Sequence, residues 1–133
     1  MTWLVVTSVV VGVIIALSGV LVVWVANRAA DGRLGMNSWA GVRTKATQSS
    51  PEAWSIGNRV ARPSTVNGGW LLVIGGLVSA VFPTVFVGGD SDQFAAVWAG
   101  TVLLFSGPAV GMILYGTWLG NRAALDYIEM TDD

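Results

Sequence analysis

Three long stretches of the chain contain no charged side chain and are dense in valine, isoleucine, leucine and other apolar residues. They cover about residues 3–26, 69–88 and 94–119. A helix of about 20 apolar residues crosses a hydrocarbon layer about 30 Å thick, so each stretch is long enough to span a membrane. The pattern therefore predicts an all-α membrane protein with three transmembrane helices.

A soluble bundle and a cleaved signal peptide both fit the apolar stretches less well. A soluble three-helix bundle needs polar side chains along the outer face of each helix, but Ser18 is the only polar side chain in residues 9–25. A cleaved signal peptide begins with basic residues and has an apolar core of about 7–15 residues. Here the first basic residue, Arg28, follows the apolar stretch, which is typical of a membrane anchor with its amino end outside.

The charges between the stretches predict the orientation of the chain. The loop of residues 27–67 holds six basic and two acidic residues, a net charge of +4, whereas residues 88–93 hold two acidic residues and no basic one. By the positive-inside rule the long loop lies in the cytoplasm. We therefore expect one membrane domain over residues 1–133 in the cell (inner) membrane, with the amino terminus outside and the tail, residues 120–133, in the cytoplasm.

The second half of the long loop is predicted to form a short amphipathic helix. Ser50 is a favoured cap residue, Pro51 suits the first helical position, and Pro63 predicts the end of the helix. Such a helix either lies at the inner headgroups or packs against its own bundle, and the pattern fits both. The arginines expected to contact lipid phosphates are Arg28, Arg33, Arg59 and Arg62.

Small residues recur four positions apart within the predicted spans, a spacing that lets helix backbones approach closely in lipid. The contact could join the chain's own helices, or it could form a seam for another membrane protein or a second copy of the chain. The residues predicted to serve in helix packing are Ser8, Gly12 and Ala16 in the first span, Gly75 and Ser79 in the second, and Gly107 and Gly111 in the third.

The first half of the long loop carries a polar motif. Its residues are Asn37, Gly41, Arg43, Thr44 and Thr47, followed downstream by Trp54 and Asn58. At these residues the sequence resembles the SdpI family of bacterial membrane proteins, whose hallmark is an Asn, then Gly-Ile-Arg-Thr, a second Thr, and a downstream Trp and His or Asn before a Gly-rich transmembrane helix. The resemblance covers about residues 5–120 in outline, and the chain corresponds to a single short unit of that family.

The sequence departs from the family pattern at three positions. Val42 replaces the usual Ile, Lys45 stands where Pro is frequent, and Asn58 stands where His is often found. An Asn does not change its charge near neutral pH, so a role that depends on protonation is disfavoured at position 58. A preference for arginine over lysine, with abundant alanine, valine and glycine, indicates a high-GC bacterium such as an actinobacterium.

The motif allows two interpretations. In the first, Arg43 binds a carboxylate or phosphate, Thr44 and Thr47 supply hydroxyl groups, and Gly41 allows a close backbone approach. In the second, Arg43 caps backbone carbonyls at helix ends, while Asn37, Trp54 and Asn58 hold the loop against the bundle. These side chains order the fold in the second interpretation and bind a ligand in the first.

The composition argues against several classes of function. Only 11% of the residues are charged, and histidine and cysteine are absent, so we expect no metal, no cofactor and no catalytic residue. The predicted spans hold no charged residue, whereas ion-coupled carriers usually mark their path with such residues. Nucleic acid is not an expected partner, because the adjoining anionic lipid already accounts for the basic loop.

Two hypotheses of function remain, both without catalysis. The resemblance implies an immunity or envelope-stress sensing protein that binds a peptide toxin or a cytoplasmic regulator. Alternatively, the chain is an accessory subunit that packs against a larger membrane complex through its small residues.

Overall fold

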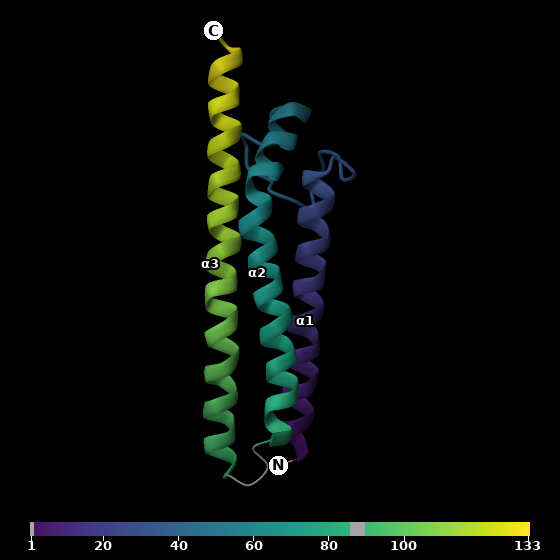
Figure 1. Cartoon of the computed structure of the whole chain (residues 1–133), viewed down its shortest axis with the longest axis vertical. Helices are drawn as coiled ribbons and strands as arrows, with labels where there is room; N and C mark the ends of the chain where they lie inside the picture. The colour runs from purple at the N-terminus through teal and green to yellow at the C-terminus, as the bar shows by residue number, and fades with distance from the viewer. Residues whose placement is uncertain (1, 86–89) are drawn as a thin grey trace.

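The computed structural model describes residues 2–85 and 90–133, and three helices make up most of this part of the chain. They are α1 (Thr2–Ala30), α2 (Pro51–Val85) and α3 (Ser91–Thr131). All three are long and apolar enough to cross a membrane, which confirms the predicted fold class. The helices lie side by side with alternating direction (Figure 1), and α2 packs on both neighbours while α1 and α3 make few contacts with each other.

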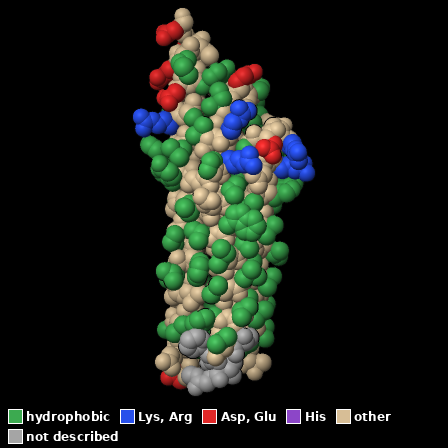
Figure 2. Space-filling view, viewed as in Figure 1, with side chains coloured by type: hydrophobic (Ala, Val, Ile, Leu, Met, Phe, Trp, Pro, Cys, Tyr) green, Lys and Arg blue, Asp and Glu red, His purple; other side chains and the backbone are tan. Residues whose placement is uncertain are grey.

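The two ends of the bundle differ. One end carries the α1–α2 loop and the carboxyl terminus, and we call it the loop end. The other end carries the start of α1, the end of α2 and the start of α3. The predicted end of the second span at residue 88, and the first part of the connection 88–93, lie outside the described residues. Lys and Arg side chains gather near the loop end, whereas many hydrophobic side chains lie along the surface of the rest of the bundle (Figure 2).

Large apolar side chains cover the outside of the bundle, the reverse of a water-soluble protein. Leu17 on α1 is 64% exposed and Leu104 on α3 is 70% exposed. Leaving such side chains in water would forfeit roughly 1.5–3 kcal/mol each relative to burial, whereas lipid accommodates them without that loss. Most of the buried side chains are instead small, and Trp54 and Phe94 are the large exceptions among the described residues. Close backbone contact between helices therefore takes the place of a core of large side chains.

The contact between α1 and α2, which we call the α1–α2 seam, is built on glycines. A Cβ added at Gly12 would lie 2.6 Å from the carbonyl oxygen of Gly76, and one added at Gly19 would lie 2.5 Å from that of Gly69. The backbone of Ala16 lies in the same seam, against Gly76. Ser8, predicted to serve in packing, is 1% exposed. The backbones of α1 and α2 are thus in direct contact over about two helical turns.

The contact between α2 and α3, the α2–α3 seam, uses a different set of α3 residues from the predicted one. A Cβ added at Gly120 would lie 2.5 Å from the carbonyl oxygen of Gly57, and one at Gly116 would lie 2.9 Å from that of Ala61. Near the middle of the helices, the position of Gly75 faces the Phe105 side chain.

The predicted packing residues Gly107 and Gly111 do not contact the other helices of this chain. Among the described residues, a Cβ added at either would meet no atom of another helix within 4 Å. They lie on α3 away from the α2–α3 seam, because the seam selects the face that carries Ala109, Gly116 and Gly120. Packing of Gly107 and Gly111 against another membrane protein or a second copy remains a prediction.

The helix predicted for the second half of the loop is not separate from the second span. The Ser50 hydroxyl accepts a hydrogen bond from the Ala53 N–H at 3.1 Å, and α2 then continues without interruption past Pro63 to Val85. A proline removes one i→i−4 backbone hydrogen bond. This loss does not by itself end a helix when tertiary contacts stabilise the residues on both sides of the proline. Here Gly57 before Pro63 and Gly68 after it both pack against α3.

Helix α3 continues about three turns past Leu119, where the predicted third span ends. At its start, the Asp90 carboxylate accepts hydrogen bonds from the N–H groups of Asp92 and Gln93 at 2.9 and 2.8 Å, a cap that suits the positive end of the helix dipole. At its far end, Ala124 is fully buried in a cluster. The other members of that cluster are Ala46, Ala53, Tyr127 and Ile128.

Replacing Ser79 by alanine is expected to raise the thermal stability of the protein. Ser79 is 0% exposed, and within the described part of the chain its hydroxyl has no hydrogen-bond partner. A buried polar group left unpaired costs about 1–3 kcal/mol, so Ser79→Ala should raise Tm in mild detergent. The matched control is Ser8→Ala, because the buried Ser8 hydroxyl donates to the Val5 carbonyl at 2.8 Å. Equal losses of Tm in both variants would contradict the prediction.

Candidate functional site

Thr47 is the centre of the polar motif. It is fully buried, and its hydroxyl donates to the Val42 carbonyl at 2.7 Å and accepts from the Thr44 N–H at 2.9 Å. In return, the Thr44 hydroxyl accepts from the Thr47 N–H at 3.2 Å. The Thr47 methyl group lies against Gly57 of α2. Both threonine hydroxyls therefore bond within the loop, and Thr47 fastens it to the bundle.

Asn58 joins the loop to α2. Its side chain is 4% exposed, its Oδ1 accepts from the Val42 N–H at 2.8 Å, and its Nδ2 donates to the Trp54 carbonyl at 3.0 Å. The chain passes this point through Gly41, whose φ of +92° favours glycine. A Cβ at Gly41 would also lie 2.9 Å from both the Asn58 Oδ1 and the Trp54 ring. Conformation and space thus both require glycine here.

Trp54 and Asn37 fix two other points of the loop. Trp54 is 3% exposed and its indole N–H donates to the Leu34 carbonyl at 3.2 Å. The Asn37 Oδ1 accepts from the N–H groups of Trp39 and Ala40 at 2.9 and 2.8 Å, which closes a local turn. The Gln48 side chain donates to the Asn37 carbonyl at 2.9 Å. The amide and indole groups of the motif thus bond to the backbone of the loop.

Arg43 is the one exposed side chain among the seven motif residues, although Asn37, Gly41 and Thr44 are only partly buried. Its NH1 group donates to the Ser38 carbonyl, which lies in the loop and not at a helix end as predicted. A guanidinium has five N–H groups, so this bond leaves others directed to solvent or to a ligand. Of the two interpretations of the motif, the described contacts of six residues correspond to ordering of the loop, and Arg43 is compatible with either.

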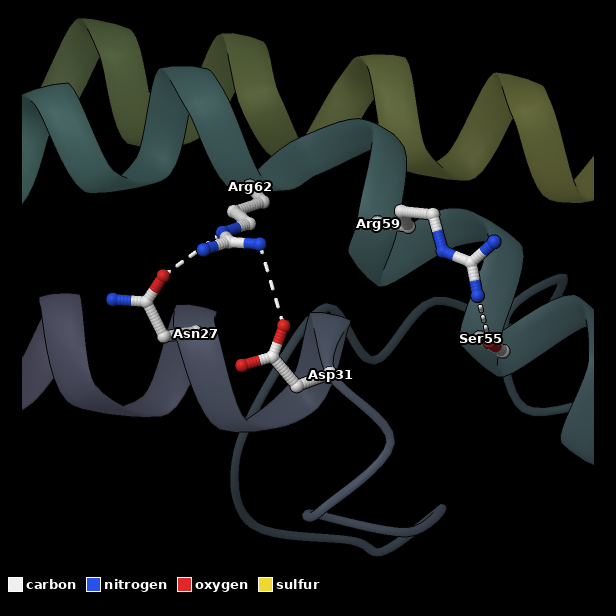
Figure 3. Close-up of polar contacts among 5 residues, drawn as sticks. All are labelled: Asn27, Asp31, Ser55, Arg59 and Arg62. Carbon is white, nitrogen blue, oxygen red and sulfur yellow. Dashed lines mark hydrogen bonds and ion pairs between the residues drawn. The ribbon is translucent and has the colours of Figure 1, made fainter.

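The basic residues near the loop end have different partners. The Arg62 Nε donates to the Asn27 side chain at 2.8 Å, and its NH1 group pairs with the Asp31 carboxylate at 3.3 Å (Figure 3). These contacts join α2 to the end of α1. Arg59 donates to the Ser55 hydroxyl at 3.4 Å on the same helix.

The remaining predicted headgroup residues lie at the surface. The Arg28 guanidinium lies 4.9 Å from the centre of the Trp24 ring, a cation–π contact, and Arg33 is exposed in the loop. On α3 the Arg122 guanidinium lies 5.5 Å from the centre of the Trp118 ring. Contact of any of these arginines with lipid phosphates remains a prediction.

A pocket of about 300 Å³ lies beneath the loop that carries the motif, residues 31–50, which we call the motif loop. Its floor is one face of α2, from Asn58 through Arg62 to Thr65, and residues 39–42 of the loop cover it. Apolar side chains of α1 and residues of α3 form its two walls. Three elements of the fold and the motif loop thus meet around one cavity.

The described residues hold no group of three or more carboxylates that could bind a metal ion. The polar groups that line the pocket are Asn58, Arg62, Thr65 and Thr117. Asn58 uses both ends of its amide in the bonds above, and the Thr117 hydroxyl donates to the Ile113 carbonyl at 3.0 Å. The arrangement can bind an apolar molecule with a polar end.

Sequence reasoning missed two parts of this region. The tail residues Ala124, Tyr127 and Ile128 repeat at helical spacing, a signal that could have predicted their packing. The pocket had no comparable signal, because its lining residues come from four segments far apart in the sequence.

Comparison with known proteins identifies the family of the chain. No curated protein and no solved structure matches the chain at a significant level. The model of the SdpI/YfhL protein family matches residues 33–116, which is more than half of the chain and includes the motif loop, all of α2 and the membrane-length part of α3 up to Gly116. This match confirms the resemblance found in the motif. The chain therefore belongs to the SdpI/YfhL family and is a multi-pass membrane protein of that type.

Proposed function

We propose that this protein acts by binding within the membrane and not by catalysis, with a role in immunity to a peptide toxin or in sensing envelope stress. In this proposal the loop end lies in the cytoplasm and the amino terminus lies outside, because the loop carries the excess of basic residues. Family membership supports the general type of protein.

The observation that carries the proposal is the open face of α3. In the part of the chain that the structure describes, Gly100, Gly107 and Gly111 would each accept a Cβ without meeting an atom of another helix within 4 Å. The neighbouring Leu103 and Leu104 are 69% and 70% exposed. A membrane-inserted peptide helix could approach this face as closely as α2 approaches the other face of α3.

The alternative function, an accessory subunit of a larger membrane complex, is favoured by the same face. A partner subunit and a peptide toxin both require close helix packing in lipid, so the structure of α3 serves either. The two functions differ in what is lost when the gene is deleted. Immunity requires that deletion sensitises cells to a peptide or to envelope stress, whereas the subunit role requires a partner that co-purifies at a fixed stoichiometry.

Gly111→Ile is expected to abolish binding without unfolding the protein. The isoleucine side chain would block close approach at the open face, while the α1–α2 and α2–α3 seams stay intact. We expect unchanged Tm in detergent, together with loss of protection or of partner recovery. The matched control is Gly35→Ile, since Gly35 is also open among the described residues but lies in the loop. Full activity of Gly111→Ile would refute binding through this face.

A further inference from the structure

We infer that the pocket beneath the motif loop is a binding site for one anionic phospholipid from the leaflet at the loop end, with part of an acyl chain between α1 and α3 and the phosphate beside Arg62. This inference does not depend on the immunity or subunit role. It rests on the level at which the pocket lies in the membrane, on the side at which it opens, and on the charges around its rim.

The pocket lies at the level of the boundary between lipid headgroups and acyl chains. Tryptophan and arginine side chains are typical of this boundary. The pairs Arg28–Trp24 on α1 and Arg122–Trp118 on α3 lie at the pocket's level, since its walls include residues 21–26 of α1 and Thr117 of α3. The pocket therefore adjoins lipid at the point where the apolar and polar parts of a phospholipid meet.

Helices α1 and α3 make few contacts with each other, and both line the pocket, so we expect its open side to lie between them. A lipid chain can enter there from the side without displacing a helix. The wall on α1 consists of Leu21, Val22, Val25 and Ala26, and Ile113 adds an apolar side chain from α3. The volume of about 300 Å³ lies at the lower end of the range of small-molecule pockets, roughly 300–1,000 Å³. It would hold part of one chain and exclude a whole lipid.

The charges at the rim favour an anionic headgroup. Arg62 lines the pocket, and its bonds to Asn27 and Asp31 use only two of the five N–H groups of a guanidinium. The surrounding segment, residues 27–67, has a net charge of +4 from six basic and two acidic residues. Arg62 also suits phosphate because guanidinium groups can bind phosphate oxygens through two parallel hydrogen bonds. An anionic phospholipid therefore satisfies both the apolar walls and the basic rim.

The test measures which lipid remains bound to the full-length protein. The chain is reconstituted in vesicles of equal parts phosphatidylglycerol and phosphatidylcholine and extracted with mild detergent, and the retained lipid is identified by native mass spectrometry. We expect one phosphatidylglycerol per chain, retained about fivefold better than phosphatidylcholine. Both lipids carry the phosphate, but the quaternary ammonium of phosphatidylcholine offsets its charge beside the basic rim, whereas phosphatidylglycerol keeps a net negative charge. Equal retention of the two lipids, or none, would overturn the inference.

Two pairs of variants locate the site. Leu21→Trp enlarges a side chain that lines the pocket, while Leu17→Trp changes a similarly exposed position one turn away that does not line it. We expect Leu21→Trp to lower phosphatidylglycerol retention about tenfold by excluding the acyl chain, and Leu17→Trp to leave it unchanged. Equal retention in both variants would show that the lipid lies elsewhere.

The second pair tests the headgroup contact. Arg62→Gln should remove the preference for phosphatidylglycerol, whereas Arg59→Gln removes a cation that does not line the pocket and should retain the preference. Asp31→Asn breaks the ion pair to Arg62 but keeps the cation, so it should preserve or increase retention. A similar loss in Arg62→Gln and Arg59→Gln would mean that the basic loop attracts anionic lipid in general, which would refute a site at Arg62.

Discussion

Gly76→Val is expected to separate α1 from α2 and to prevent stable folding of the protein. A Cβ at this position would lie 2.4 Å from the backbone nitrogen of Ala16 and 2.5 Å from the carbonyl oxygen of Gly12. Both atoms belong to the backbone of α1, so no side-chain rotation can relieve the clash. The helices would have to move apart and lose their contacts along the seam. We expect a loss of more than about 4 kcal/mol in the free energy of unfolding.

Thermal unfolding and gel filtration in mild detergent would measure this effect. Gly100→Val is the matched control, because it places the same side chain at a helical position where a Cβ meets no atom of another helix within 4 Å among residues 2–85 and 90–133. The control should behave as the natural protein. A Gly76→Val variant with natural Tm and elution volume would mean that α1 does not approach α2 as closely as described.

This expectation depends on a distinction that the sequence could not make. Small residues four apart indicated close helix packing, and Gly12 and Gly75 do face a neighbouring helix. On α3, however, the open pair Gly107 and Gly111 and the packed pair Gly116 and Gly120 have the same spacing. Helical spacing defines a face but not the neighbour of that face. Only the assembled bundle determines which pair is inside.

The helices themselves were easier to predict than their ends. An uncharged apolar stretch of membrane length is rarely anything other than a membrane-spanning helix, so the pattern predicted all three helices. Pro63, a local stop signal, did not end α2 because contacts with α3 hold the helix on both sides of it. Local rules of this kind fail where tertiary packing supplies the missing stability.

The motif residues were also recognisable in the sequence, but their bonding partners were not. Thr47, Asn58 and Trp54 bond chiefly to backbone groups of the loop and of α2. Every residue has a backbone carbonyl and nearly every residue an N–H group, so sequence cannot tell which of them a side chain will meet. Few large side chains are buried among the described residues, so these buried hydrogen bonds contribute much of what fixes the loop in place.

Asn58→Leu is expected to release the loop from α2. Leucine is close to asparagine in size but can neither accept from the Val42 N–H nor donate to the Trp54 carbonyl, which Asn58 does at 2.8 and 3.0 Å. Val42 is buried, so its N–H would be left without a partner at a cost of about 1–3 kcal/mol. Since Gly41 and Val42 also cover the pocket, the cover should open more often.

Trypsin digestion in mild detergent would detect this opening, because the loop contains Arg33, Arg43 and Lys45 as cleavage sites. Cleavage of a transiently opened segment follows the population of the open form, so a cost of about 1–3 kcal/mol should speed cleavage roughly 5- to 150-fold. Asn67→Leu, at an exposed position on α2, is the matched control and should digest at the natural rate. If Asn58→Leu were equally resistant, the loop would be held by its apolar contacts and not by the asparagine. If it were sensitive but bound phosphatidylglycerol as well as the natural protein, the loop would not be needed to retain the lipid.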